Sequence, residues 1–411
     1  MDIPGLPARR AALKLLDAVL RRGETLDQAA HNAVQGLAVD ADKGLARAIA
    51  AEALRWLTDI DALIDSATRE LLPEDAKARS VLRLMLAQWL RLGTPPHAVV
   101  ATALPLLTGG PKRLAHGVFA TLTRRQASLP EHPSLPPQVA ARWGGQGPVI
   151  AQALAEPPPL DLTLRDPATT TAWSERLGGT SLLPGHLRLP RGEAVERLDG
   201  YAEGAWWVQD LAASLPARLL GPGPGAALDL CAAPGGKALQ LAAMGWTVTA
   251  LDASAKRLER LRANLSRVGL TASVVVADAL AWEPTERFDA ILLDAPCTAT
   301  GTCRRHPDVL HRITETQIAD MAALQQRLIA RAALWLRPGG RLVYAVCSLE
   351  REEGEAVAST IPLTPMPIRA EELPDGLAPS PEGWLRTDPG MLRAAGGLDG
   401  FFVARWMYGE A

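Results

Sequence analysis

Short apolar strands alternate with amphipathic helices along the second half of the chain, and this order constrains the fold more than any other feature. The strand candidates are apolar along most of their length, and helical stretches separate them. This pattern is typical of a parallel sheet that helices cover on both faces. The sequence therefore predicts a doubly wound, Rossmann-like α/β domain in the C-terminal half. Its strand candidates are residues 226–230, 247–252, 273–278, 289–294 and 341–348.

Residues 8 to about 126 have the apolar spacing of helices. The first segment places Leu13, Leu16 and Leu20 on one face and stops at Gly23, and similar segments follow. Helices joined by short loops predict an all-α bundle. Prolines then become frequent, and between about 160 and 205 we expect a small α+β segment. Its predicted elements are strands at 160–165 and 186–190 and a helix near 170–177.

The length and charge of the chain fit a multidomain protein that binds nucleic acid. A chain of 411 residues is too long for one compact core. The net charge is −2, but residues 1–130 carry +4 and the remainder −6. A basic first domain joined to an acidic one is compatible with nucleic-acid binding. The sequence has no apolar run of about 20 residues and no secretory signal pattern, so we expect a cytoplasmic protein.

Four cysteines, Cys231, Cys297, Cys303 and Cys347, all lie in the predicted α/β domain. A disulfide framework is not expected, because the first 230 residues contain no cysteine. No Cys-x-x-Cys pair is present, and the nearby histidines follow no zinc-ligand spacing, so no metal site is expected. Two of the thiols, Cys297 and Cys347, come at the ends of apolar strands, where ligands bind in such sheets.

Polar residues at the strand ends predict a cofactor pocket. The loop CAAPGGK follows the first strand, and Asp252, Asp278 and Asp294 follow or end the next three. A carboxylate some twenty residues beyond the loop is suited to two ribose hydroxyls. The loop lacks the dinucleotide pattern, and Cys231 and Ala238 replace the first glycine and the hydroxyl residue of a P-loop. A cofactor without phosphates fits better, and S-adenosylmethionine is the expected one.

Seven segments stand in a fixed order along the second half of the chain. They are GAWWVQDLAAS, LDLCAAPGGKALQLA, ALDASAKRLERLRANLSRVG, VVVADA, FDAILLDAPCTATGTCRRHPD, LVYAVCSLEREE and DGFFVARW. They resemble the ordered motifs of the Sun family of RNA cytosine-carbon-5 methyltransferases. The N-terminal helices, ending LAHGVFATLTRR, resemble the NusB-type RNA-binding domain of the RsmB branch, which modifies a cytosine of bacterial 16S rRNA.

The resemblance implies three domains and an RNA substrate. It implies a helical NusB-like RNA-binding domain at 1–130, a linker with a small α+β RNA-binding subdomain at 131–215, and a methyltransferase domain at 216–411. The expected partner is RNA, most simply 16S rRNA or a small-subunit precursor, and the expected protein is a monomer without metal or membrane partners. The alternatives are a tRNA cytosine-carbon-5 methyltransferase, a weakly active or inactive RNA-binding assembly factor, and a DNA or small-molecule methyltransferase.

The chemistry of cytosine explains why two thiols are needed. Carbon 5 is a poor nucleophile until a thiolate adds to carbon 6, which divides one hard step into easier ones. The resemblance implies that Cys347 is the nucleophile, that Cys297 assists product release, and that Asp294 stabilises the cytosine ring. It also implies a set of cofactor-binding residues, with Cys231 contributing only its backbone. These are Cys231, Ala232, Ala233, Pro234, Gly235, Gly236, Lys237, Asp252, Asp278 and Asp294.

Several residues have plainer interpretations or depart from the family pattern. Val346 stands where the family has threonine, and Gly354 stands where it often has asparagine. Cys303 is expected to be a small buried hydrophobe, His306 a loop residue, and the tryptophan pair at 206–207 part of the core. Candidate RNA-contacting residues are Arg9, Arg10, Lys14, Arg21, Arg22, Arg304 and Arg305.

Overall fold

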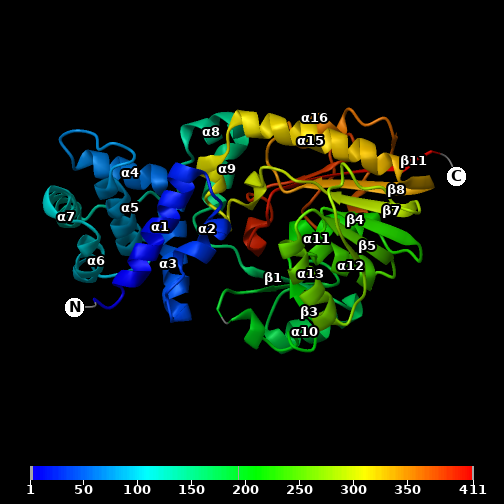
Figure 1. The fold of residues 1–411 in the computed structure, drawn as a ribbon, viewed down its shortest axis with the longest axis horizontal. Coiled ribbons are helices and arrows are strands. Elements are labelled where there is room, and N and C mark those ends of the chain that lie inside the picture. The colour runs from blue at the N-terminus through cyan, green and yellow to red at the C-terminus, as the bar shows by residue number, and fades with distance from the viewer. Residues whose placement is uncertain (1–2, 193, 410–411) are drawn as a thin grey trace. The chain divides into compact units, whose positions relative to one another are not determined.

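The structure is a computed structural model that describes residues 3–192 and 194–409. The chain forms two compact units (Figure 1). The helical unit contains the chain up to Glu156 together with Cys303–Ile313. The sheet unit contains Pro157–Thr302 and the chain from Thr314 onwards. The domain boundaries that the sequence suggests near residues 130 and 215 stay a prediction. The first predicted domain begins and the last one ends in residues 1–2 and 410–411, which lie outside the described residues.

The helical unit is built from α-helices, as the apolar spacing predicted. The first helix ends at Gly23, whose φ of 67° lies in the left-handed region and whose N–H donates to the carbonyl of Val19 at 3.1 Å. Glycine favours this C-terminal geometry because it has no Cβ. The helices are α1 (Leu6–Arg22), α2 (Leu26–Ala33), α3 (Asp40–Arg55), α4 (Leu57–Ser66), α5 (Lys77–Leu90), α6 (Pro96–Ala103), α7 (Gly109–Arg124), α8 (Pro137–Trp143), α9 (Gly147–Ala153) and α14 (Val309–Arg312).

Helix α5 forms the centre of the helical unit, because α1, α3, α4, α6 and α7 all pack against it. Its residues Leu82, Met85 and Leu86 are fully buried. The buried guanidinium of Arg83 donates to both carboxylate oxygens of Asp61, at 2.7 and 2.6 Å. A charge in the core is therefore paired rather than left without a partner.

The segment Cys303–Ile313 packs within the helical unit, although the residues before and after it belong to the sheet unit. Arg55 donates from Nη2 to the carbonyl of Arg304 at 2.9 Å, and Nε2 of His311 lies 2.7 Å from the carbonyl oxygen of Leu54. The sequence did not predict this insertion. The segment follows directly on the Pro-Cys motif, and no change in composition marks the point where the chain enters the other unit.

Several sequence predictions concern side chains that the structure places in the helical unit. Arg9 is buried and donates from Nε to Gln88 at 2.7 Å, and Arg304 is also buried, so the prediction that they contact RNA is wrong for both. A buried guanidinium with protein partners is not accessible to a phosphate. Cys303 is fully buried, as predicted, and His306 lies in a loop.

The sheet unit contains a mixed sheet in the order β10-β11-β8-β7-β4-β5-β6, with β9 paired to β11. All five predicted strands are present, and they pair in parallel. The antiparallel strands β9, β10 and β11 at one side were not predicted. The strands are β4 (Ala226–Leu230), β5 (Thr247–Asp252), β6 (Ser273–Val276), β7 (Phe288–Asp294), β8 (Leu336–Val346), β9 (Thr364–Pro365), β10 (Leu385–Thr387) and β11 (Phe401–Tyr408).

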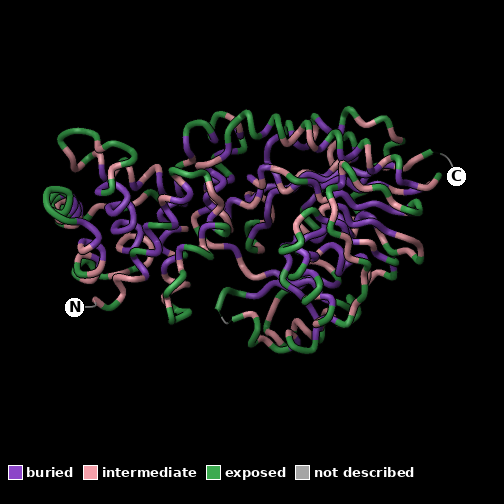
Figure 2. The backbone as a smooth tube through the Cα atoms, in the orientation of Figure 1, coloured by how far each residue is buried: buried purple, intermediate pink, exposed green. Residues whose placement is uncertain are grey.

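Helices cover both faces of the sheet, as the continuous apolar strands predicted (Figure 1). Along β7, Ala290 and Leu292 join the core on the side of α11, α12 and α13, whereas Ile291 and Leu293 join the core on the side of α15. Figure 2 shows the central strands buried along most of their length. The helices are α11 (Leu211–Leu220), α12 (Gly236–Ala243), α13 (Ala255–Val268), α15 (Glu315–Leu334) and α16 (Glu355–Ala358).

A small antiparallel sheet, in the order β2-β1-β3, precedes the large one within the sheet unit. The predicted strands and helix of this segment are present, while β3 was not predicted. Trp206 and Trp207 of β3 are buried, so their assignment to the core is confirmed. The elements are β1 (Leu160–Leu164), α10 (Thr170–Leu177), β2 (His186–Leu189) and β3 (Trp206–Val208). Among the described residues of both units, no helix is long and apolar enough to cross a membrane.

Asp161 of β1 and Arg188 of β2 form a buried ion pair, and the same carboxylate bonds to the first residue of α11. Loss of this pair is expected to destabilise the sheet unit. The carboxylate of Asp161 is fully buried and accepts from Nε and Nη2 of Arg188, both at 2.7 Å, and from the N–H of Leu211 at 3.0 Å. Arg188→Ala leaves that charge without its main partner. We expect the free energy of unfolding to fall by about 3–5 kcal/mol at pH 7, measured by urea denaturation.

The pH dependence of this effect follows from the pKa of Asp161. Burial by itself raises this pKa, but Arg188 and His186 outweigh burial, so the pKa lies well below its ordinary value. The pair therefore stabilises the folded state above the unfolded pKa of about 4, and this stabilisation is lost as the pH falls. The difference between wild type and Arg188→Ala should shrink in acid. Equal unfolding free energies at pH 7 would contradict the prediction, and exposed Arg197→Ala serves as the control.

Candidate active site

A pocket of about 480 Å³ lies at the carboxyl ends of the parallel strands. It brings together most of the predicted site residues, namely Cys231, Ala233, Pro234, Asp252, Asp278, Asp294, Cys297 and Cys347. The predicted residues Ala232, Gly235, Gly236 and Lys237 are not among those that line it. The sequence did not single out the apolar residues that line much of the wall. These include Leu251, Ala279, Leu280, Pro296, Leu324 and Leu328.

The loop from Cys231 to Gly235 forms one wall of the pocket, and close packing fixes its path. Gly235 has a φ of 111°, and a Cβ added there would lie 2.3 Å from Cδ1 of Leu261. Only glycine therefore lets the loop approach α13 this closely. The N–H of Ala232 donates to the carbonyl of Leu251 at 3.0 Å, which ties the loop to β5.

The carboxylate of Asp252 is held in place by three donors. Its Oδ2 accepts from the N–H of Ala233 at 3.1 Å and from Nη2 of Arg257 at 3.0 Å, and its Oδ1 accepts from the N–H of Ser254 at 2.8 Å. Asp252 is buried, whereas Asp278, which also lines the pocket, is exposed. The structure thus presents one rigid carboxylate and one exposed carboxylate at the ends of neighbouring strands.

The chemistry of the lining fits S-adenosylmethionine better than a phosphate-containing cofactor. Asp252, Asp278 and Asp294 are acidic, and Arg257 is the cationic residue among the described residues that line the pocket. Arg257 is already engaged by Asp252. A phosphate would face these carboxylates, whereas ribose hydroxyls and a sulfonium suit them. The apolar wall suits a purine ring.

The two thiols predicted at the strand ends lie side by side. The sulfur atoms of Cys297 and Cys347 are 3.5 Å apart, at the distance of a thiol hydrogen bond. Their strands β7 and β8 are parallel neighbours, with Asp294 opposite Ala345. The hydrogen bond to Cys347 and burial raise the pKa of Cys297 well above its ordinary value. Cys297 therefore stays a protonated thiol at neutral pH and can donate to the sulfur of Cys347.

A partly buried ion pair lies near these thiols. Nζ of Lys237 donates to Oδ2 of Asp294 at 2.7 Å. Burial lowers the pKa of Lys237, but the charge and hydrogen bond of Asp294 outweigh burial, and a Cys347 thiolate adds to the rise. Lys237 does not line the pocket, but it bonds to Asp294, which does.

Asp229 is a further acid near the pocket that the sequence prediction missed. It is the last but one residue of β4 and is fully buried. Burial, and then the charge of Asp294, raise its pKa well above the ordinary range. The sequence does mark Asp229, because an acid inside an apolar strand is unusual unless it has a structural or functional role.

Comparison with known proteins identifies the family. The model of the 16S rRNA methyltransferase RsmB/F family matches residues 218–406, and that of the NusB family matches residues 6–108. Ribosomal RNA small subunit methyltransferase B of Xanthomonas campestris is 36% identical over 85% of this chain and 86% of its own length. Its counterpart in Xylella fastidiosa strain Temecula1 is 35% identical over 98% of both chains. The chain belongs to the RsmB family of RNA methyltransferases.

Solved structures agree with this fold. The protein PH0851 has a TM-score of 0.73 and 22% identity over 98% of this chain and 99% of its own. NSun6 from Pyrococcus horikoshii, whose structure contains SFG, has a TM-score of 0.57 and 20% identity over 67% of this chain and 97% of its own. The identities are low, so these likenesses concern the fold alone.

The two departures from the pattern of the RsmB family have structural contexts. Val346 is fully buried at the end of β8, opposite Phe402 of β11, so its methyl groups are in the core. At Gly354, an added Cβ would lie 2.3 Å from Nη2 of Arg386. That guanidinium pairs with Glu355 and donates to the carbonyl of Ser348, and it occupies the space that a side chain at position 354 would need.

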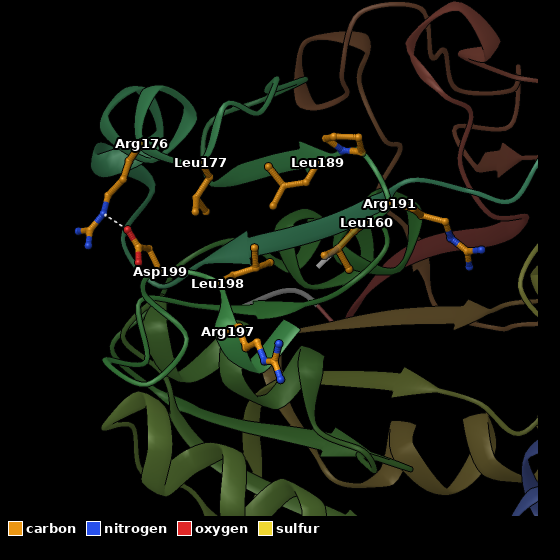
Figure 3. A pocket seen from close by; sticks show the side chains of 10 residues that line it. Leu160, Arg176, Leu177, Leu189, Arg191, Arg197, Leu198 and Asp199 are labelled. Carbon is orange, nitrogen blue, oxygen red and sulfur yellow. Dashed lines mark hydrogen bonds and ion pairs between the residues drawn. The ribbon is translucent and has the colours of Figure 1, made fainter. Parts of the chain in front are cut away.

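A second pocket, of about 380 Å³, lies on the small sheet of this RsmB-family chain (Figure 3). Leucines form its floor, and Arg176, Arg191 and Arg197 lie around it. Arg176 pairs with Asp199 at 3.1 Å. None of the predicted catalytic or cofactor-binding residues lines this pocket, so it is not the candidate active site.

Proposed function

We propose that the chain transfers a methyl group from S-adenosylmethionine to carbon 5 of a cytosine in RNA, through a covalent adduct with Cys347. The observation that carries this proposal is the 3.5 Å separation of the Cys297 and Cys347 sulfur atoms in a pocket that also presents Asp252 and Asp294. One thiol would suffice for packing. Two adjacent thiols beside a carboxylate-lined pocket suit a reaction in which one adds and the other helps it to leave.

The proposed steps use residues in fixed positions. The Cys347 thiolate adds to carbon 6 of the cytosine and makes carbon 5 nucleophilic. A bound S-adenosylmethionine would supply an electrophilic methyl group, which carbon 5 takes while the sulfur keeps the electron pair of the broken sulfur–methyl bond. Asp294, held by Lys237, is proposed to contact the ring and to stabilise charge at nitrogen 3. The carbon-5 proton then passes to a base such as water, and the electrons of that bond restore the double bond between carbons 5 and 6 and expel the Cys347 thiolate.

The proposed substrate is 16S rRNA, by analogy with the relatives named small subunit methyltransferases. The target cytosine must be unpaired or flipped out of its stack, at a cost of a few (~2–4) kcal/mol, because its ring is inaccessible inside a duplex. We propose that the helical unit and the small sheet bind RNA and offset this cost. Arg10 and Lys14 are exposed on α1 and remain candidate contacts.

The test is methyl transfer in vitro to RNA from cells that lack the modification. The protein is incubated with methyl-labelled S-adenosylmethionine and with separated 16S rRNA, tRNA or DNA, and labelled positions are mapped after bisulfite treatment. Label at a cytosine of 16S rRNA supports the proposal. Label only in tRNA would favour the tRNA enzyme, and binding of 16S rRNA without transfer would favour an assembly factor.

A substitution at Asp252 tests the cofactor pocket. Asp252→Asn keeps one acceptor oxygen but removes the charge proposed to hold the ribose hydroxyls. Charge-assisted hydrogen bonds contribute about 1.5–3 kcal/mol, so we expect the Kd for S-adenosylmethionine to rise by about 10- to 100-fold in isothermal titration calorimetry. The exposed Asp375→Asn serves as the control. An unchanged Kd in a folded Asp252→Asn protein would exclude Asp252 from the cofactor site.

A further inference from the structure

A fully buried carboxylate, Glu353, lies behind the two thiols and does not line the pocket. Its Oε1 accepts from the N–H of Thr298 at 2.8 Å and from Nε2 of Gln325 at 3.3 Å. Its Oε2 accepts from the hydroxyls of Thr298 and Ser348. Burial raises the pKa of Glu353 above its ordinary value, and the four hydrogen bonds oppose this rise.

These partners flank both cysteines. Thr298 follows Cys297 on the loop after β7, and Ser348 follows Cys347 on the loop after β8. Gln325 of α15 also donates to the carbonyl of Pro296 at 2.9 Å, on the other side of Cys297. One carboxylate is therefore bonded directly to both thiol-bearing loops.

Further hydrogen bonds join the Cys297 loop directly to the Cys347 loop. The N–H of Gly301 donates to the carbonyl of Cys347 at 3.0 Å, and the N–H of Leu349 donates to Oγ1 of Thr300 at 3.0 Å. The hydroxyls of Thr300 and Ser348 are 3.3 Å apart. The carboxyl group of Glu353 accepts four hydrogen bonds in this network, so it joins more partners there than any single hydroxyl does.

We propose that Glu353 is a positioning residue that holds the Cys297 and Cys347 loops at the separation that the two thiols require. It touches neither the pocket nor either sulfur atom, and it acts through Thr298 and Ser348. The benefit for methyl transfer rests on the proposed function, but the positioning itself can be measured without RNA. A buried acid that only filled space would not need hydrogen bonds to both loops.

The two variants of Glu353 separate geometry from charge. Glu353→Gln keeps an acceptor oxygen for the N–H of Thr298, and its amide group can donate to the hydroxyls of Thr298 and Ser348, which rotate to accept. Glu353→Ala removes every one of these bonds. Glu352→Ala is the matched control, because it removes the carboxylate next to Glu353 in sequence, and that carboxylate is exposed.

The first measurement is the rate at which diamide joins the two thiols. Each thiol gives up one hydrogen atom as the sulfur–sulfur bond forms, and diamide takes up both and is reduced to its hydrazine. Peptide mapping identifies the Cys297–Cys347 product. We expect wild type and Glu352→Ala to react alike, Glu353→Gln within about threefold, and Glu353→Ala at least about tenfold more slowly, because displacement by about 1 Å is costly for such contacts.

The second measurement is steady-state methyl transfer. If Glu353 positions the thiols, Glu353→Ala should lower kcat by about 100-fold while KM for RNA and cofactor changes by less than about threefold. Glu353→Gln should restore most of kcat. A general loss of structure would instead change KM and the thermal unfolding midpoint together.

The results distinguish this inference from the proposed function. Slower disulfide formation in Glu353→Ala supports positioning even if wild type methylates no RNA, in which case the proposed function fails alone. An unchanged oxidation rate in folded Glu353→Ala overturns the inference. If Glu353→Ala does not fold, the oxidation rate is measured in Ser348→Ala, which removes the bond from Glu353 to one loop. Slower oxidation in Ser348→Ala supports positioning, and an unchanged rate overturns it.

Discussion

Cys347→Ala is expected to abolish methyl transfer, with a loss of at least about 1,000-fold in kcat. Without a thiolate at this position, nothing adds to carbon 6, and carbon 5 stays too weak a nucleophile to accept the methyl group. The adjacent Cys297 does not replace it, because its raised pKa keeps it a protonated thiol. Cofactor binding should be preserved, since the loop Cys231–Gly235 and Asp252 remain in place.

The measurement pairs methyl transfer with covalent trapping. Wild type and Cys347→Ala are incubated with RNA and S-adenosylmethionine, and a denaturing gel reports any protein–RNA adduct. Cys303→Ala is the control, because Cys303 belongs to the helical unit and lies outside the pocket. We expect full activity in Cys303→Ala, and neither adduct nor product in Cys347→Ala. Activity in Cys347→Ala would assign the nucleophile to another residue.

The proximity of the two thiols could be predicted because parallel strands end at one edge. Cys297 and Cys347 are 50 residues apart in sequence, but each follows an apolar strand, and β7 and β8 are neighbours in the sheet. The same rule brought Asp252, Asp278 and Asp294 to one pocket. Predictions of this kind depend only on strand direction, which the helical connections fix.

Other features could not be predicted because they depend on tertiary contacts. Glu353 stands in a charged run next to exposed Glu352, and local sequence gives no sign that one of the two is buried. The insertion of Cys303–Ile313 into the helical unit depends on bonds from Arg55, which lies about 250 residues earlier. Strand β8 begins at Leu336 and includes Pro338 and two glycines, which argue locally against a strand.

The correction at Arg9 has the same origin. The sequence shows two adjacent arginines on an amphipathic helix, and nothing local tells which of them faces the core. In the structure Arg9 bonds to Gln88 of α5, whereas Arg10 is exposed. Charge counts therefore locate a basic domain but not the side chains that are accessible to RNA.

Cys297→Ala is expected to trap the enzyme on its substrate. The Cys297 thiol lies 3.5 Å from the Cys347 sulfur and can donate a hydrogen bond to it as it leaves carbon 6. Removing this donor should leave adduct formation intact and slow its breakdown, with turnover falling by about 100-fold or more, a typical contribution of a positioned proton donor. A slowly migrating protein–RNA band should accumulate on denaturing gels and disappear after ribonuclease treatment.

The double variant Cys297→Ala/Cys347→Ala provides the matched control, because it removes the nucleophile from the same background. It should form no adduct, and this would assign the trapped bond to Cys347. If Cys297→Ala instead turned over at the wild-type rate without a trapped species, Cys297 would not assist release, and its contact with Cys347 would be one of packing. If the double variant still formed the adduct, a residue other than Cys347 would be the nucleophile, and the pairing of the two strand ends would need another explanation.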